Sequence, residues 1–234
     1  MNVPGRRGLT LRIKAVLVVG LSVATMVALL HLTLSSVLLR EYRALEEREM
    51  RVDMNRVTDA LQHAIAELHS KSGDWADRDE TYEYMVTRDP AFIRSNLNIV
   101  ALQTMSLHLI AFVDTTGQLA TYRALDTERR PLTELPPALK AALASGLPLV
   151  TARSDSDERS GVLIVGNTPM LVSSRSIRSS EATGRSHGIL IFARYLSAVD
   201  VRALGAQTHV SLELWPVGAT LPADATAALP PLLG

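Results

Sequence analysis

The sequence predicts an α+β protein in which an N-terminal transmembrane helix and a long second helix lead into a domain built on an antiparallel sheet. Three observations predict this class. Residues 15–39 form an apolar run without a charged side chain. Residues 40–73 carry a helical apolar stripe without an internal proline or glycine. From residue 107 onward, strand-like segments come in pairs around turns with helices between them, which favours an antiparallel sheet over a doubly wound parallel one.

The apolar run at residues 15–39 is long enough to cross a bilayer, because a helix rises about 1.5 Å per residue and the hydrocarbon layer is about 30 Å thick. Residues 1–14 hold several basic side chains and no acid, so the positive-inside rule predicts a cytoplasmic N-terminus. We therefore expect a single-pass protein of the inner membrane whose following domain is periplasmic or extracellular. A cleaved signal peptide is the alternative, but its apolar core is usually only about 7–15 residues long.

Residues 40–73 are predicted to form one long membrane-proximal helix. Its apolar side chains recur at spacings of three and four, and the repeat is regular only after Met50. We expect the first half to be solvated, the second half to pack on a domain, and Gly73 to end the helix. Two interpretations stay open for this helix, a plain stalk or the interface of a homodimer.

A new helix is predicted to begin at Trp75 with Asp74 as its N-cap and to end near Arg88, because the residue before Pro90 is pushed out of the helical region. After it, residues 107–125 predict a hairpin in which Gly117 takes the turn conformation. A short helix is expected in "LPPALKAALASGLP", ending at Gly146.

The second half of the sheet is predicted from three further segments. "GVLIV" and "MLVSSRSI" flank the turn "GNTP" and predict a second hairpin, and "ILIFARYL" predicts the strand that follows. "SAVDVRALG" predicts a helix with a capping box made by Ser197 and Asp200 and a stop at Gly205. "HVSLELW" is expected to form a last strand. The predicted domain organisation is a cytoplasmic N-terminus, a transmembrane helix, a membrane-proximal helix, an extracytoplasmic sensor domain and a Pro-, Ala- and Leu-rich tail, at residues 1–14, 15–39, 40–73, 74–215 and 216–234.

Composition excludes several functions. Without cysteine there is no disulfide scaffold, thiol catalysis or cysteine-bound zinc, and the balance of 24 Lys plus Arg against 24 Asp plus Glu gives no field that would attract nucleic acid. The six histidines lack metal-ligand spacing, and no phosphate loop, nucleophile elbow or kinase signature is present. "SDSDE" has carboxylates two apart but lacks the rest of a calcium loop, so a solvated loop is expected. We therefore expect no catalytic residue, metal or cofactor, and no enzyme activity in this chain.

The candidate ligand site is built around an acid among aromatics. Steps of about 100° per residue place Asp79 on one helical face with Trp75 and Tyr82. A buried carboxylate needs a partner, which is either protein or ligand. In the first case Asp79 is a structural strut. In the second, these three residues form a pocket, with Asn96 and Arg175 as further polar contributors, for a small molecule carrying an amine or another donor.

Longer stretches resemble a known family. "DWADRDETYEYM" followed by "FIRSNLNIVALQTMSLHLIAFVDTTGQL", and later "MLVSSRSI" and "HGILIFARYLSAVDVRAL", are similar to the type-four CHASE domain, an extracellular sensory module of bacterial receptors. The similarity covers residues 41–215, with one departure at Arg78, where many members have a second Trp. It implies a PAS-like or Cache-like sensor fold with a long N-terminal helix packed against a sheet. In that family the sensor is set between two membrane helices, and its outputs are usually cyclic-di-GMP or histidine-kinase domains.

The predicted function is therefore a membrane-anchored extracytoplasmic sensor module that binds an unidentified small-molecule signal. This sequence shows none of the output domains, so we expect the sensory half of a longer receptor, a tethered binding protein or a truncated remnant. The alternative is a non-catalytic dimerisation or protein-interaction module tethered to the membrane, whose long helix forms the homodimer contact.

Overall fold

The computed structural model describes residues 11–144, 157–179 and 185–215, and within them the side chains of residues 11–18, 35–41, 43 and 44 lie outside the description. The chain divides into two compact units, Met1–Asn55 and Arg56–Gly234. Helix α1 (Leu11–Ala76) contributes residues to both units. The predicted stop at Gly146 and the predicted tail at residues 216–234 lie outside the described residues.

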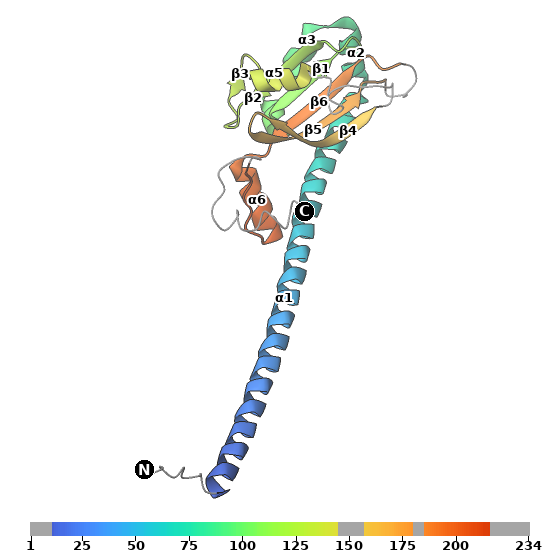
Figure 1. The fold of residues 1–234 in the computed structure, drawn as a ribbon. Helices are drawn as coiled ribbons and strands as arrows, with labels where there is room; N and C mark the ends of the chain where they lie inside the picture. Colours follow the sequence, from blue (N-terminus) through green and yellow to red (C-terminus); the bar gives the residue numbers. More distant parts are fainter. Residues whose placement is uncertain (1–10, 145–156, 180–184, 216–234) are drawn as a thin grey trace. The chain divides into compact units, whose positions relative to one another are not determined.

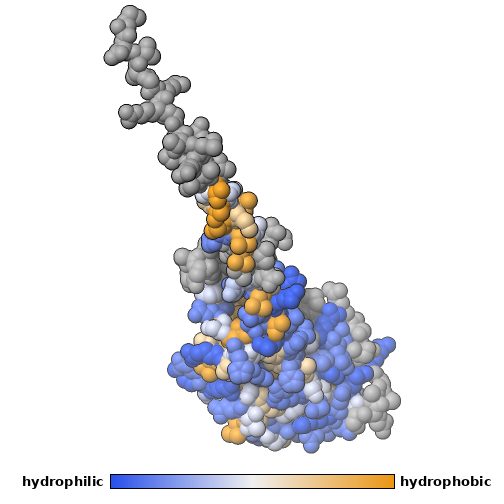
Figure 2. Space-filling model, turned by 90° about the horizontal axis from the view of Figure 1, so that it is seen from below, coloured by the Kyte–Doolittle hydropathy of each residue, from blue (hydrophilic) through white to orange (hydrophobic). Residues whose placement is uncertain are grey.

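In the first unit, the described residues are those of α1 up to Asn55. The apolar side chains between Val19 and Leu34 are exposed, with Leu21 and Met26 at 70% and 72%. Figure 2 shows hydrophobic side chains gathered on this part of the molecule. Among the helices that the structure describes, none combines the length and the apolar character that a membrane crossing requires. Part of the predicted span at residues 15–39 has side chains outside the description.

In the second unit, the end of α1 packs against the domain. Leu68 is buried in the core, and Leu61 and Ile65 pack beside it. Met50 and Met54, which belong to the same predicted stripe but to the first unit, are exposed. The expectation of a solvated first half and a packed second half is confirmed. The predicted stop at Gly73 is wrong, because the helix continues to Ala76.

Helix α2 (Asp79–Thr87) begins later than predicted. Its N-cap is Arg78, which has an extended backbone, and Asp74 lies within α1 and caps no helix. The helix is therefore interrupted between Trp75 and Asp79. Side-chain directions in α2 cannot be calculated from those in α1 by steps of about 100° per residue. The predicted end is confirmed, since Arg88 takes a left-handed conformation with φ +58°.

Two short helices follow α2. The α3 helix (Pro90–Asn96) is capped by the side chain of Asp89, which accepts a hydrogen bond from the Ala91 amide at 2.8 Å. The α4 helix (Ile99–Thr104) is capped in the same way by Asn98. Both helices lead the chain into the first strand of the sheet.

In the described part of the chain, six antiparallel strands form one sheet in the order β3-β2-β1-β6-β5-β4. Both predicted hairpins and the strand predicted at residues 189–196 are confirmed, and the turn glycines Gly117 and Gly166 have positive φ values of +82° and +63°. The strands are β1 (Leu109–Val113), β2 (Leu119–Leu125), β3 (Pro131–Leu132), β4 (Glu158–Val165), β5 (Thr168–Ser176) and β6 (Ile189–Tyr195).

The two remaining helices were also expected. The α5 helix (Pro137–Ala144) follows the short β3 strand. The α6 helix (Ala198–Thr208) has the predicted capping box of Ser197 and Asp200, but Gly205 lies inside it. The predicted last strand at residues 209–215 is wrong, because these residues join no sheet. After the left-handed His209, the Val210 amide donates back to the Gly205 carbonyl at 3.0 Å, which turns the chain onto α6.

The sheet separates two hydrophobic clusters, as alternating side chains of each strand point to opposite faces. Ile110 and Phe112 of β1 belong to the cluster that contains Leu68 of α1 and side chains of α2, α3 and α4. Leu109 and Ala111 belong to the other cluster, which includes side chains of α5. Figure 1 shows the sheet between α2 and α3 on one side and α5 on the other.

Candidate functional site

Trp75 lies at the end of α1 and packs on the sheet. Its ring meets Phe192 edge to face, with centroids 5.9 Å apart. The Arg78 guanidinium covers the indole ring, with Cζ 4.7 Å from its centroid. A cation over an indole face is favourable, so this contact stabilises the position of the Trp75 ring.

Tyr82 of α2 is held by a histidine from the segment before β6. Its hydroxyl oxygen lies 3.0 Å from His187 Nε2, and the two rings meet edge to face with centroids 4.6 Å apart. Both side chains are half-buried. The polar atom that we expected to face a ligand therefore has a protein partner.

Asp79 is exposed, in contrast to the prediction that it lies on an apolar face. The buried residues of α2 are Thr81, Tyr84 and Met85. The prediction assumed one continuous helix, but α1 ends at Ala76 and α2 begins at Asp79. Asp79 therefore does not share a helical face with Trp75, and its carboxylate stays in contact with solvent. At the first turn of α2 its carboxylate is favourable to the helix dipole.

Asn96 lines a groove of about 360 Å³ between α2 and α3. Tyr84 and Phe92 stack at 4.7 Å in this groove with their ring planes 15° apart. The groove is also lined by three carboxylates, those of Glu80, Glu83 and Asp89. Three small polar side chains complete the lining. Tyr84 is buried and Phe92 is half-buried, so Phe92 is the ring that a cationic molecule in the groove can contact beside these carboxylates.

Arg175 of β5 belongs to a charged cluster beside α1. Its Nη1 donates to Glu158 Oε1 at 2.9 Å, and its Nη2 lies 3.1 Å from His69 Nε2. Glu158 is the first residue of β4 and opposes Arg175 directly in the register. The "SDSDE" stretch therefore ends in an ion pair of the sheet.

The proton positions in this cluster follow from Arg175, because a guanidinium can only donate. His69 Nε2 must accept, so its Nδ1 carries the proton and donates to Ser173 Oγ at 3.0 Å. Ser72 Oγ donates to the His69 carbonyl at 2.8 Å, so Ser173 donates to Ser72 across 2.7 Å. This polar network, made by His69, Ser72, Glu158, Ser173 and Arg175, connects α1 to β4 and β5.

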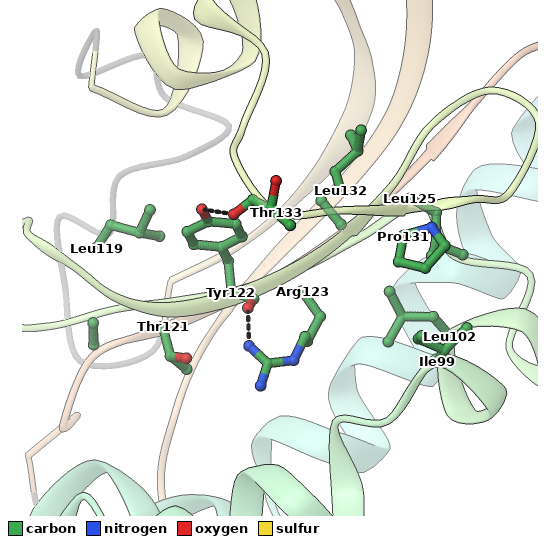
Figure 3. A pocket seen from close by; sticks show the side chains of 12 residues that line it. Ile99, Leu102, Leu119, Thr121, Tyr122, Arg123, Leu125, Pro131, Leu132 and Thr133 are labelled. Carbon is green, nitrogen blue, oxygen red and sulfur yellow. Dashed lines mark hydrogen bonds between the residues drawn. The ribbon is translucent and has the colours of Figure 1, made fainter.

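A second groove, of about 550 Å³, runs along β2 between α4 and β3 (Figure 3). Tyr122 and Arg123 extend from β2 on opposite sides of the strand in this view. The Tyr122 hydroxyl donates to the Thr133 carbonyl at 3.2 Å. This groove was not predicted from the sequence, because it depends on how α4 and the short β3 meet the edge of the sheet.

The five predicted site residues do not form one pocket. Trp75 and Tyr82 are packed against protein partners, and Asp79 is exposed at the start of α2. Asn96 lines the groove between α2 and α3, and Arg175 belongs to the polar network. Sequence reasoning missed His69, Ser72 and Ser173, because their partners are more than a hundred residues away in the chain.

Within the described residues, a six-stranded antiparallel sheet covered by helices, with the end of a long helix joined to it by the polar network, defines an α+β domain. The family model of the CHASE4 domain matches residues 60–215. The chain belongs to this family, and residues 60–215 are an extracellular signal-sensing module.

Individual proteins resemble the chain more distantly. It is 25% identical over 155 residues to the methanogenesis regulatory histidine kinase FilI of Methanothrix harundinacea (strain 6Ac), an overlap of 66% of this chain and 17% of that protein. The periplasmic domain of Vibrio cholerae LuxQ is 9% identical with a TM-score of 0.48, covering 75% of this chain and 80% of that one. The E. coli DcuS sensor domain is 12% identical with a TM-score of 0.36, covering 64% and 96%. The chain thus spans about a sixth of the length of the curated relative.

Proposed function

We propose that this chain is the sensory part of a membrane receptor and that it binds a small cationic molecule in the groove between α2 and α3. The observation that carries the proposal is the composition of that groove. The stacked rings of Tyr84 and Phe92 lie among three carboxylates, and the amide of Asn96 adds a further polar group. A primary or quaternary amine can pair with these carboxylates and lie against the half-buried ring of Phe92.

The groove is connected to α1 through the core. Tyr84 contacts Phe112 of β1 edge to face at 5.4 Å, and both belong to the hydrophobic cluster that contains Leu68 of α1. Close-packed cores transmit small displacements. A ligand that shifts the stacked rings would therefore press on the core against which α1 packs, and the polar network would carry the same change from the sheet to His69.

The receptor is proposed to be anchored by residues 15–39, with a cytoplasmic N-terminus and the sensor domain outside the inner membrane. The exposed apolar side chains between Val19 and Leu34 support this anchor, because contiguous exposed apolar surface of this kind marks a membrane or protein contact. An output of the cyclic-di-GMP or histidine-kinase type would be supplied by a linked domain or by a partner, and this chain itself would have no catalytic role.

The experiment is a thermal-shift screen of the purified full chain in a mild nonionic detergent with a panel of primary, secondary and quaternary amines. A binder should raise the melting temperature of the wild type in a saturable way. Glu83→Gln should abolish most of the shift, since it removes one groove carboxylate. Glu213→Gln, an exposed acid outside the groove, is the matched control and should respond like the wild type.

The variant Asp79→Ala separates this site from the pocket predicted around Trp75 and Tyr82. If Asp79→Ala stays folded and loses the shift while Glu83→Gln keeps it, the ligand binds at the predicted pocket. If no amine gives a saturable shift in the wild type, the proposed ligand class is wrong.

A second candidate function is a membrane-tethered dimerisation module. It is supported by Met50 and Met54 of α1, which are 65% and 55% exposed and four residues apart on one helix face. The membrane-proximal helix would then form the homodimer contact. Sedimentation of the full chain at high micromolar concentration tests this function, and a monomer would rule it out.

A further inference from the structure

The groove along β2 differs from the proposed amine site in shape and in charge. Twelve residues line its roughly 550 Å³, and most are apolar, including Ile99 of α4, Leu119 of β2 and Pro131 of β3. This volume falls in the range of about 300–1,000 Å³ that small-molecule sites occupy. None of the lining residues is acidic.

The groove follows an incomplete edge of the sheet. The short strand β3 pairs with Ala124 and Leu125, and among the residues that the structure describes no strand pairs with the outer edge of β2 from Leu119 to Arg123. The Leu125 amide donates to the His108 carbonyl on the β1 side. Because antiparallel strands alternate their bonding direction residue by residue, Tyr122 presents its N–H and C=O to the open edge.

Arg123 is the one charged residue among the twelve that line the groove. Its Nη1 donates to the carbonyl of the neighbouring Tyr122 at 2.9 Å, and within the part of the chain that the structure describes no carboxylate forms an ion pair with it. Figure 3 shows the guanidinium extending from β2 between Thr121 and the side chains of Ile99 and Leu102. A guanidinium bound only to a neutral carbonyl can still form the charge-assisted bidentate pair that it makes with a carboxylate.

We propose that this groove binds a small monocarboxylate of about six to ten carbons in all, whose chain forms an apolar body. The carboxylate would pair with the Arg123 guanidinium and accept the edge N–H of Tyr122. The apolar body would cover Ile99, Leu119 and Pro131. The site goes beyond the proposed function, because it lies on other elements and selects a ligand of opposite charge.

The test is isothermal titration of the purified full chain, in a nonionic detergent, with hexanoate, and with hexanamide and hexylamine as matched probes. Hexanoate should give saturable heat, while hexanamide, which keeps the shape without the charge, should bind at least about tenfold more weakly. Hexylamine should not compete for this groove.

Two variants locate the binding. Arg123→Gln should weaken hexanoate by about tenfold or more, and Ile99→Asp, at a position that is 41% exposed, should abolish binding by placing a like charge in the groove. Arg202→Gln, an exposed arginine of α6, is the control and should bind as the wild type does. Far-UV circular dichroism checks that each variant is folded.

Absence of saturable hexanoate heat in the wild type would overturn the proposal, and so would unchanged affinity in Arg123→Gln. Equal affinity for hexanoate and hexanamide would also overturn it, since the charge would then play no part. Because hexanoate is an anion and the variants lie outside the groove between α2 and α3, failure here leaves the amine proposal standing, and failure of the amine screen leaves this one standing.

Discussion

The guanidinium of Arg175 lies directly against Gly73 of α1. A Cβ atom added to Gly73 would stand 2.8 Å from Arg175 Cζ and 3.0 Å from its Nη1. The missing side chain in the helix thus makes the room in which Arg175 reaches His69 and Glu158. The contact fixes the position of α1 on β5 at the point where the polar network crosses between them.

The first prediction is a coupling between these two residues. In the background of Arg175→Ala, Gly73→Ala should stabilise the domain by about 1 kcal/mol, which is the ordinary helix preference for Ala over Gly. In the wild type the new methyl group displaces the guanidinium and its two hydrogen bonds, so the gain should disappear or reverse. Urea unfolding of the four proteins should give a coupling energy of about 1–2 kcal/mol. Additive effects would show that the contact carries no energy.

The second prediction concerns Ser173, which is fully buried and accepts from His69 while donating to Ser72. Ser173→Ala leaves the His69 Nδ1 proton and a Ser72 lone pair without this partner. We expect a loss of about 1–3 kcal/mol in the free energy of unfolding. Ser95→Ala on the exposed surface of α3 is the control and should cost under about 0.5 kcal/mol. Equal small effects would mean that the network adds nothing to stability.

The third prediction concerns Gly188, the residue directly before β6. Its φ of +136° is open only to glycine, and a Cβ there would collide with the Val113 carbonyl oxygen. Gly188→Ala should destabilise the domain by about 3 kcal/mol or more. Gly117→Ala is the matched control, because it has positive φ but open space, and should cost only about 1–2 kcal/mol. Thermal unfolding that ranks the two equally would contradict the steric part of this explanation.

The two hairpins and the strand at residues 189–196 could be predicted from the sequence because their determinants are local, whereas the two-residue strand β3 was not predicted. Turn residues such as Gly117 and Gly166 lie between alternating apolar segments, and short hairpins fix their own register. The ends of the helices were harder to predict than the strands. Gly73 and Gly205 both suggested helix stops, but each lies inside a helix where another segment approaches closely, Arg175 in one case and the Val210 carbonyl in the other. Composition does not distinguish a glycine that ends a helix from one that makes room for a tertiary contact.

The candidate site was predicted less well for a related reason. The prediction that Trp75, Asp79 and Tyr82 share one helical face assumed a single uninterrupted helix. The helix is interrupted before Asp79, so this assumption was wrong. Arg175 was chosen as a polar strand residue, but its partners come from α1 and β4. Such partners are set by the packing of distant elements, and a single sequence carries no local sign of them.

The last prediction is a dependence of stability on pH that comes from His108. This residue is 2% exposed, and its Nδ1 accepts the Tyr195 amide at 3.2 Å. Burial, followed by the nearby charge of Arg129, lowers the pKa of His108 from 6.5 to about 4. The folded protein therefore holds the neutral ring in a range where the unfolded chain binds a proton.

Because the unfolded state takes up more protons below pH 6.5, stability should be full above that pH and should fall as the pH decreases toward about 4. The full loss from this one group is at most about 3 kcal/mol. His108→Asn keeps an acceptor for the Tyr195 amide but cannot be protonated. Urea unfolding at several pH values should therefore show a flatter profile for this variant than for the wild type between those limits. Parallel profiles would mean that His108 titrates alike in the folded and unfolded states, and that other groups cause the acid sensitivity.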